Sequence, residues 1–365
     1  MTTDLSADLA IIGGGIIGCF VAHQAAHARP DRRVVLLERS TIGAGATAWS
    51  AGVSFPLAAT APHRRLVRDA ATAFARLRDT TAGRFLRPMR MIYVVGRAGR
   101  DAFHGRVVDA ELRVVTEDER GRVERMLPGV RLGADEELLT HDGYGFAVDA
   151  RGLAEWLVSE GVTVHSGQNV TGIHPEAGGY RLVGDRATWS AGRAIVATGA
   201  WPVPGPRSDG PAVRTKRVAA LHADLPTEPG DPLVYFLDDD LFFLPSATGP
   251  TLVSFYRDIW DLDPASMDGR ASEDDLRCGT DAVRRRSPAA AEAVTAGRAF
   301  CDGYAPDRLP VVTAHPDHPG LVSIRGGSGS GVRLAPALAA AALRTAGDPT
   351  PSNRSSDTAP AAGRR

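Results

Sequence analysis

The chain has 365 residues, of which 43% are hydrophobic and 23% charged, and its formal net charge at pH 7 is −1. The balanced charge argues against nucleic acid or an anionic membrane surface as a partner. Three cysteines without a CxxC spacing argue against a disulfide framework or a zinc site. The sequence has no apolar run of roughly 18 residues and no pattern of a cleavable leader, so we expect a cytoplasmic globular protein without a metal.

The segment from Asp8 to Gly52 carries the strongest pattern in the chain. An apolar run at residues 9–12 predicts a buried parallel strand. The motif GGGIIG at residues 13–18 and a helix-compatible stretch follow at once, and a second apolar run then ends in Glu38. This order of strand, glycine turn, helix, strand and acid predicts a Rossmann-like βαβ unit that binds a dinucleotide.

Each residue of this motif has an expected task. Gly13 permits the tight turn, Gly15 lets the backbone approach a pyrophosphate, and Gly18 lets helix and strand pack closely. The helix N-terminus offers N–H donors to the phosphates, and Glu38 stands where a carboxylate accepts hydrogen bonds from the ribose hydroxyls. A glycine-rich turn without a ligand is the alternative, and the complete context disfavours it.

A second run of small residues, IGAGATAWSAG at residues 42–52, follows the acid. Small side chains there allow a broad, flat ring system to lie against the backbone, and Thr47 and Ser50 offer hydroxyls. The segment resembles the amino terminus of the flavoprotein amine and amino-acid oxidases, the family of D-amino-acid oxidase, glycine oxidase and monomeric sarcosine oxidase. Trp49 departs from the basic or small residue often found at this place in the family.

Two later stretches carry the same resemblance. The stretch GRAIVATGAW at residues 192–201 resembles the second contact with the cofactor diphosphate, and Pro306-Asp307 with Leu309-Pro310 resembles the carboxy-terminal signature. The strand, glycine loop and helix at residues 320–336 raise the alternative of a second nucleotide site, but no strand-ending acid follows. We expect this helix to point its amino end at the flavin.

The resemblance implies bound FAD and assigns its contacts to residues of all these stretches. They are Gly13, Gly15, Ile16, Ile17, Gly18, Glu38, Arg39, Gly45, Ala46, Thr47, Ser50, Ala51, Gly52, Val170, Thr198, Gly199, Ala200, Gly326, Gly327, Ser328, Gly329, Ser330, Gly331 and Val332.

The spacing of apolar residues predicts the remaining helices and strands. Residues 62–78 have a helical apolar period with Pro62 in the first turn, and residues 90–95 and 161–165 read as strands. Asp149 is placed to cap a helix. From residue 215 to 260 the pattern becomes β-rich, with a tight hairpin link at residues 238–240, and residues 272–294 look helical.

We therefore predict an α/β fold, a Rossmann-like FAD-binding domain with an inserted antiparallel-sheet substrate domain. Residues 1–83, 141–214 and 300–347 form the FAD-binding domain, residues 84–140 and 215–299 form the substrate domain, and residues 348–365 form a disordered tail.

The substrate site is expected under the inserted sheet, with Tyr235, Phe243, Tyr256 and Arg257 as lining. In glycine oxidase an arginine that binds the substrate carboxylate stands five residues before the signature Asp, and Asp302 occupies that place here. Gly329 occupies the place of a second family arginine.

Other groups are candidates for the substrate's ends. A carboxylate of the substrate could be bound by Arg257, Arg325, Arg333 or Arg90. Alternatively, Asp302 could face a cationic amine of the substrate.

For two residues near the expected flavin, we prefer a structural role to a functional one. His63 can face the flavin, but a solvated histidine at a helix start is preferred. Cys301 lies about one position away from the cysteine that holds flavin covalently in sarcosine oxidase, and a buried inert thiol is preferred.

The resemblance implies an enzyme that oxidises a C–N bond of a small-molecule amine or amino acid to an imine, by hydride transfer to N5 of non-covalent FAD, with O2 reduced to H2O2. The flavin carries the hard step, so an obvious acid–base pair is not required. We expect a specialised substrate rather than a common amino acid. Two alternatives stay open: the flavin subunit of a multi-protein amino-acid dehydrogenase, and a non-catalytic flavoprotein.

Overall fold

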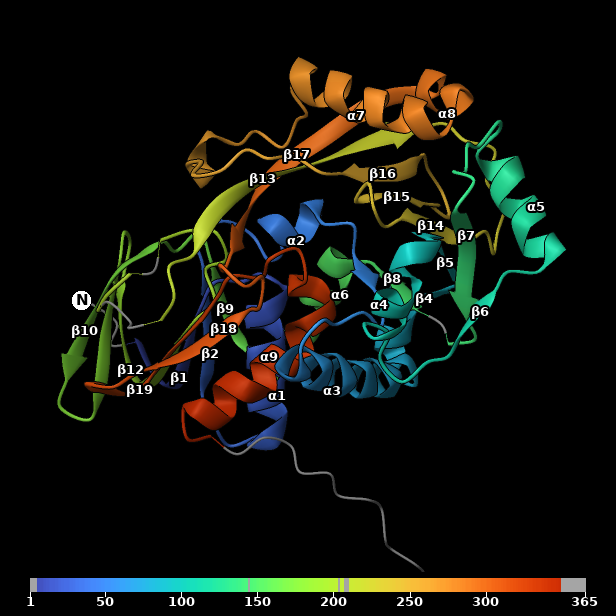
Figure 1. Cartoon of the computed structure of the whole chain (residues 1–365). Coiled ribbons are helices and arrows are strands. Elements are labelled where there is room, and N and C mark those ends of the chain that lie inside the picture. The colour runs from blue at the N-terminus through green and yellow to red at the C-terminus, as the bar shows by residue number, and fades with distance from the viewer. Residues whose placement is uncertain (1–4, 144, 203, 207–209, 349–365) are drawn as a thin grey trace, which may run out of the picture.

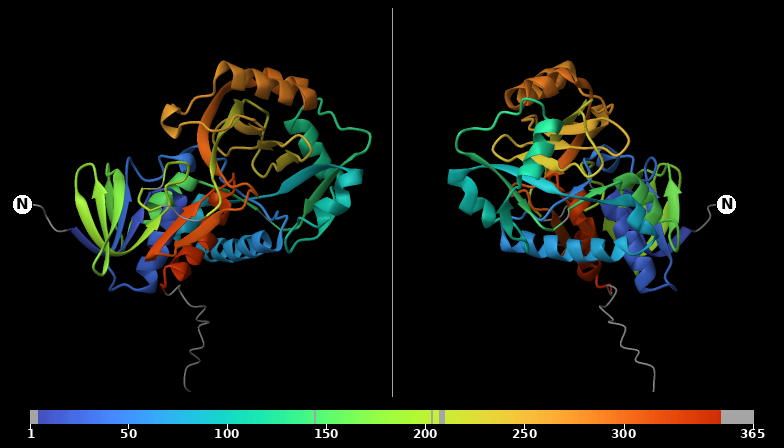
Figure 2. Two further views of the ribbon diagram at one scale, coloured as in Figure 1. Left: turned by 60° about the vertical axis from the view of Figure 1, so that its left-hand side comes forward. Right: turned by 90° about the vertical axis from the view of Figure 1, so that its right-hand side faces the viewer.

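A computed structural model of the protein describes residues 5–143, 145–202, 204–206 and 210–348. It has two main parts, each built on an eight-stranded sheet (Figures 1 and 2). Two long strands of the second sheet run down toward the first part and join the two (Figure 1). This mixture of parallel and antiparallel sheets confirms the predicted α/β fold with an inserted sheet.

The first sheet has a parallel centre, because β12, β1, β2 and β9 pair in parallel in that order. β12 also pairs with β11, antiparallel, along its first half and with β19, parallel, along its end. The strands of this sheet are β1 (Leu5–Ile12), β2 (Val34–Glu38), β9 (Thr163–Ser166), β10 (Val170–Glu176), β11 (Gly179–Gly184), β12 (Thr188–Val196), β18 (Val311–His315) and β19 (His318–Arg325).

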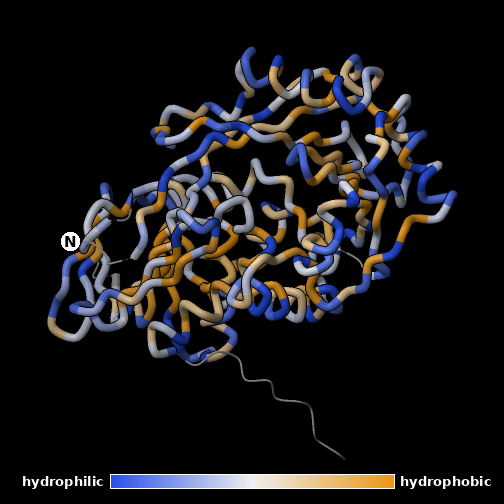
Figure 3. The backbone as a smooth tube through the Cα atoms, viewed as in Figure 1, coloured by the Kyte–Doolittle hydropathy of each residue, from blue (hydrophilic) through white to orange (hydrophobic). Residues whose placement is uncertain are grey.

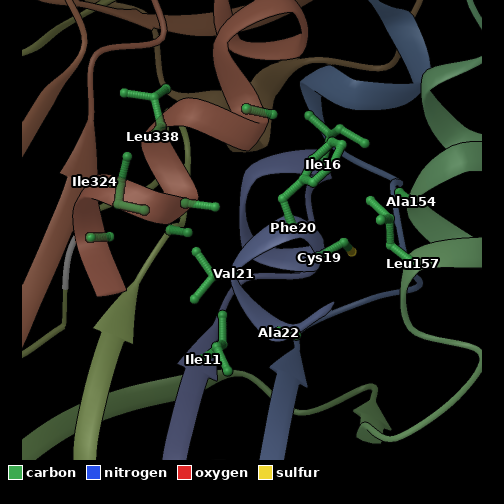
Figure 4. Close-up of a cluster of buried hydrophobic side chains, with 14 of the residues drawn as sticks. Ile11, Ile16, Cys19, Phe20, Val21, Ala22, Ala154, Leu157, Ile324 and Leu338 are labelled. Atoms are coloured by element: carbon green, nitrogen blue, oxygen red, sulfur yellow. The ribbon is translucent and has the colours of Figure 1, made fainter. Parts of the chain in front are cut away.

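Alternating residues of β1 serve two hydrophobic cores. Leu9 and Ile11 pack in the core that α1, α3, α6 and α9 form on one face of the sheet, and Figure 4 shows Ile11 below Val21 of α1. Ala10 and Ile12 pack on the opposite face, under the β10–β12 layer. The helices are α1 (Ile16–Ala28), α3 (Ala61–Arg78), α6 (Ala150–Leu157) and α9 (Gly331–Thr345).

The second sheet has the order β17-β13-β16-β15-β14-β5-β7-β6 and is antiparallel except where β14 meets β5. Its strands are β5 (Met91–Gly96), β6 (Leu112–Val114), β7 (Glu136–His141), β13 (Arg214–Ala223), β14 (Leu233–Phe236), β15 (Leu241–Leu244), β16 (Thr251–Phe255) and β17 (Val294–Tyr304). α7 (Glu273–Arg286) and α8 (Pro288–Glu292) cover its outer face, and α5 (Glu117–Met126) lies at its far end (Figure 1).

Smaller elements join the two parts. A three-stranded antiparallel sheet has the order β3-β8-β4. The elements are β3 (Val53–Ser54), β4 (Leu86–Met89), β8 (Gly145–Val148), α2 (Ala46–Trp49), α4 (Arg100–His104) and the 3-10 turns Thr81–Phe85, Arg97–Gly99 and Pro264–Ser266. Apolar stretches gather in the interior of the molecule, while α5 and α7 carry many hydrophilic residues (Figure 3).

Several local predictions are confirmed. The helix predicted at residues 62–78 is α3, and the Asp149 carboxylate accepts a hydrogen bond from Gly152 N at 3.0 Å, capping α6. Residues 237–240 form the tight link between β14 and β15.

Two expectations about boundaries need correction. The expected domain boundary at residue 300 falls inside β17, which continues from one part into the other. Asp348 was expected to open a disordered tail, but its side chain is buried and forms ion pairs with Arg32 and Arg193. The rest of that expected tail, residues 349–365, lies outside the described residues.

The described residues contain neither a membrane-spanning helix nor a cluster of metal ligands. Within the described ranges, no helix is long and apolar enough to cross a membrane. In the same part of the chain, no group of three or more His, Cys, Asp or Glu side chains is arranged to hold a metal ion.

Candidate functional site

A cavity of about 1190 Å³ lies between the carboxyl ends of the parallel strands and the inner face of the second sheet. Of the residues predicted to contact FAD, all except Gly18 lie on its wall, although they come from the start, middle and end of the chain. Crevices at the carboxyl ends of parallel strands are the usual place for a ligand in such sheets. The fold therefore brings these separated stretches to one site.

Gly13 and Gly18 are required by packing. Gly13 has φ = +108°, and a Cβ atom there would lie 2.4 Å from Ala197 O. A Cβ atom at Gly18 would lie 2.0 Å from Gly13 O, where α1 crosses the turn. Gly18 thus does not line the cavity. It permits the close packing of helix and strand that the sequence predicts.

A second group of glycines faces open space. At Gly45 and Gly199 a Cβ atom would meet no described atom within 4 Å. At Gly15 it would meet Thr47 Oγ1 at 3.4 Å, and at Gly331 it would meet Ile17 Cδ1 at 3.9 Å. Side chains at these positions would protrude into the cavity, so the glycines form a cradle that suits a ligand in close contact with the backbone.

Glu38 and Thr47 organise the rim of this cradle. The Glu38 carboxylate accepts hydrogen bonds from Gly14 N and Ser40 N, both at 2.7 Å. Thr47 Oγ1 accepts from Ile16 N at 2.9 Å, which satisfies the first amide of α1. The first turn of α1 contains no acidic residue, and its positive end faces the cavity beside the Glu38 carboxylate.

The glycine loop before α9 is fixed from the roof of the cavity. Asp302 on β17 accepts hydrogen bonds from Gly329 N at 2.9 Å and Gly303 N at 2.8 Å. Burial raises the pKa of the Asp302 carboxyl, and these two N–H groups oppose the rise. Ser328 and Gly329 have φ values of +51° and +72°, so the loop turns through left-handed backbone conformations.

Arg333, in the first turn of α9, carries a buried charge with neutral partners. Its guanidinium donates to the Phe55 and Leu57 carbonyls, to Ser330 Oγ and to His63 Nε2, the last at 3.2 Å. Burial lowers its pKa to about 10, still well above neutrality. Arg333 therefore remains a cation that no carboxylate neutralises among the described residues.

The expectation of a solvated His63 is wrong. Its ring lies on the cavity wall, half-buried, with Nε2 accepting from Arg333. Burial, with the neighbouring charges of Arg333 and Arg106, lowers the pKa of His63 to about 4. The histidine is neutral at pH 7, and the proton sits on Nδ1, because Nε2 is the acceptor.

Of the four residues predicted to line the substrate site, three lie on the cavity wall and one does not. Tyr235, Tyr256 and Arg257 line the cavity, and the Tyr235 hydroxyl donates to Asp240 at 2.8 Å. Phe243 does not line it, because its side chain points to the opposite face of the sheet and is fully buried there.

The Arg257 guanidinium is engaged by two carboxylates of α7. Its partners are Asp274 and Asp275, the latter at 3.0 Å from Nε. These ion pairs leave Arg257 poorly placed to bind a substrate carboxylate.

Sequence reasoning missed Lys216. Its side chain points from β13 into the cavity, as do those of Val218 and Ala220 at alternate positions of the strand. The available signal was this alternation, together with the fact that Lys216 is the only lysine in an arginine-rich chain.

A family profile described as FAD dependent oxidoreductase matches residues 8–344. The chain belongs to this family. No curated protein sequence is significantly similar to it.

Solved structures of this fold are similar over nearly the whole chain. Glycine oxidase from Geobacillus kaustophilus is 20% identical, with a TM-score of 0.74, and the alignment covers 95% of this chain and 96% of that one. L-α-glycerophosphate oxidase from Mycoplasma pneumoniae, solved with FAD bound, is 16% identical, with a TM-score of 0.78 and coverage of 96% and 97%. L-proline dehydrogenase from P. horikoshii is 16% identical, with a TM-score of 0.78 and coverage of 95% of each chain. At such identities the likeness concerns the fold.

The cavity of this FAD-dependent oxidoreductase fits its family's cofactor. The open glycine cradle, the positive ends of α1 and α9, and a carboxylate at the end of β2 supply the surfaces that a dinucleotide needs.

Proposed function

We propose that the protein oxidises a C–N bond of an amine or amino acid to an imine and that dioxygen takes up the electrons as hydrogen peroxide. Two similar structures are named as a glycine oxidase and an L-proline dehydrogenase, which supports this substrate class. The observation that carries the proposal is the positive charge of Arg333 at the start of α9, which forms no ion pair with a described carboxylate and faces the same cavity as the glycine cradle.

The residues assigned to FAD have separate tasks in this proposal. Gly15 and the start of α1 receive the pyrophosphate, Glu38 the ribose hydroxyls, and Val170 the adenine. The turn at residues 198–200 makes the second diphosphate contact, and residues 326–332 lie against the flavin. When bound, FAD supplies the acceptor for the hydride that leaves the substrate carbon.

The start of α9 acts electrostatically. Its first turn has no acidic residue, and Arg333 adds a full positive charge within that turn. Because all five N–H groups of Arg333 are held by neutral acceptors, the charge is fixed in place before the substrate arrives. A fixed positive field of this kind stabilises negative charge that develops beside it.

Carboxylates on the cavity wall suit the amine end of a substrate. Asp302 and Asp240 both line the cavity, and each oxygen of Asp302 retains a lone pair after accepting one backbone hydrogen bond. We assign Asp302 to accept an amine N–H, with Tyr235 and Tyr256 as polar lining. Arg257 supports the roof through Asp274 and Asp275.

We propose non-covalent FAD. Cys301 lines the cavity, but burial raises the pKa of its thiol, which disfavours the thiolate that an attachment reaction needs. Denaturation should therefore release all of the yellow colour into the supernatant.

The proposal is tested by an anaerobic panel of amines and amino acids mixed with FAD-loaded protein. Loss of the visible flavin band, with formation of an imine or its carbonyl hydrolysis product, supports C–N oxidation. Admission of air then separates the acceptors, because an oxidase releases peroxide at each turnover, whereas a dehydrogenase subunit stays reduced. Bound FAD that no amine or amino acid reduces contradicts the proposal.

A further inference from the structure

Lys216 lies in an aromatic enclosure on the roof of the cavity. Only 5% of its surface is exposed. Its Nζ atom lies 3.9 Å from the centre of the Tyr256 ring, 5.1 Å from that of Tyr304 and 5.2 Å from that of Trp260. Faces of aromatic rings attract a cation, but they replace only part of the hydration that it loses on burial.

The ammonium group has no anionic partner in contact. Among the described residues, none forms a hydrogen bond or ion pair with Nζ, and burial lowers the lysine pKa. Asp240 and Asp258 act on it from longer range and Arg308 opposes them. Asp258 is occupied, because it accepts from the Tyr256 hydroxyl at 3.1 Å and from Trp260 Nε1 at 2.6 Å.

Most other cations of the wall are already engaged. Arg217 and Arg257 form ion pairs with Asp275, and all five N–H groups of Arg333 donate hydrogen bonds to neutral acceptors. Arg39 stacks on the Trp201 ring at 3.2 Å. Lys216 is thus a buried cation on the described wall with three N–H donors still free, directed into the space where a substrate must lie.

The position of Lys216 connects this space to the glycine loop. Lys216 is the cross-strand partner of Asp302, so both side chains leave the same face of the sheet. The Tyr304 hydroxyl lies 3.2 Å from the place of a Cβ atom at Gly329. An anion bound at Lys216 would therefore lie one side chain away from the loop that we assign to the flavin.

We propose that Lys216 binds a carboxylate of the substrate, enclosed by Tyr256 and Tyr304, so that the enzyme acts on an amino acid rather than on a simple amine. This inference rests on the proposed function and names the substrate class of the same site. A single buried ammonium between apolar rings suits a singly charged carboxylate better than a phosphate dianion, which would need further desolvated cations.

The test uses FAD-loaded protein titrated with benzoate, with uncharged benzamide and with inorganic phosphate, followed by calorimetry. Lys216→Met keeps the length of the stem and removes the charge, and Lys216→Arg keeps the charge. Arg106→Met is the matched control, because Arg106 is also a cation on the wall but lies at the end near His63 and Arg333.

We expect benzoate to bind about tenfold or more weakly to Lys216→Met and nearly normally to Arg106→Met. Lys216→Arg should retain part of the affinity, and benzamide should bind all proteins weakly. Unchanged benzoate affinity in Lys216→Met overturns the inference, as does a Lys216-dependent preference for phosphate. Neither result depends on turnover, so failure of the proposed function shows separately, as FAD that no amine or amino acid reduces.

A second measurement guards against misfolding of the variants. Reductive methylation with isotopically labelled formaldehyde marks the only lysine side chain of the chain. In the FAD-loaded protein, NMR should show that signal shifted by the nearby ring of Tyr256, and benzoate but not benzamide should move it further. A signal that ignores benzoate contradicts the assignment of Lys216.

Discussion

The glycines of the first turn differ in what surrounds the place where a side chain would stand. Gly13 and Gly18 are surrounded by backbone, whereas Gly15 borders the open cavity. The same motif therefore contains residues that the fold needs and a residue that only a ligand needs. Substitutions separate these two requirements.

Gly15→Leu should weaken FAD binding by about 100-fold or more, because the added side chain fills the place of the pyrophosphate. Folding should persist, since Gly15 has an ordinary φ of −71°. The measurement is FAD fluorescence quenching, with thermal melting as a check on folding. Gly121→Ala on α5, where a Cβ atom meets nothing within 4 Å, is the control. Normal FAD affinity in Gly15→Leu would refute the assignment of the cradle.

His63 should make stability depend on pH. Its pKa of about 4 in the folded protein lies below the ordinary 6.5, because burial and Arg333 disfavour the charged ring. As the pH falls from 6.5 to 4, the unfolded chain takes up a proton before the folded protein does, and stability falls. With allowance for partial exposure, we expect a loss of about 1 kcal/mol.

This loss is measured by urea unfolding at the two ends of the pH window. His63→Gln should reduce the loss, whereas His104→Gln, at an exposed position at the end of α4, should leave it unchanged. An identical pH profile in His63→Gln and the unsubstituted protein would show that the ring is not held neutral in the folded state.

At the scale of elements, the start of α7 holds the roof together. Asp275 is fully buried, completes a capping box with Ser272, and binds Arg217 of β13 and Arg257, which lies just after the end of β16. One carboxylate therefore fixes α7 against β13 and against the segment that follows β16. Removing it leaves two guanidinium groups without their buried partner.

Asp275→Ala should lower the free energy of unfolding by about 3–5 kcal/mol, the cost of breaking a buried ion pair from one side. Asp281→Ala is the matched control on the same helix, because Asp281 pairs with Arg284 in solvent, where such a pair contributes about 0–1 kcal/mol. Denaturant unfolding compares the two. Equal effects of the two substitutions would mean that the network does not anchor the roof.

Elements whose cause is local could be predicted from the sequence. The first glycine turn, the Asp149 cap and the Asp238–Asp240 link each depend on a few adjacent residues, and all appear as expected. Side-chain directions on the second sheet were harder, because strand register is set by partners far along the chain. The sequence pattern therefore predicts the wrong face for Phe243 and gives no sign that Lys216 faces the cavity.

Long-range partners limited prediction in the same way elsewhere. His63 was expected in solvent because its neighbour Arg333 lies 270 residues away along the chain. Asp348 follows the last helix in a polar stretch, yet it meets Arg32 and Arg193 from the first part of the chain. Neither contact leaves a local pattern in the sequence.

At the scale of the whole molecule, the cavity is closed by the start, middle and end of the chain and by the second sheet. A ligand that touches all of them binds the folded protein and not the unfolded chain. FAD at 1,000 times its dissociation constant should therefore add about 4 kcal/mol of stability. Thermal melting with increasing FAD checks this, and Gly15→Leu should abolish the increase. A melting temperature indifferent to FAD would contradict binding across the segments.

The central claim is that this chain binds FAD in the cradle between its two sheets. Its most direct measurement is the visible absorption spectrum of the purified protein after incubation with FAD and gel filtration. We predict a yellow protein with stoichiometric FAD, all of it released on denaturation. A protein that stays colourless after incubation would contradict the account.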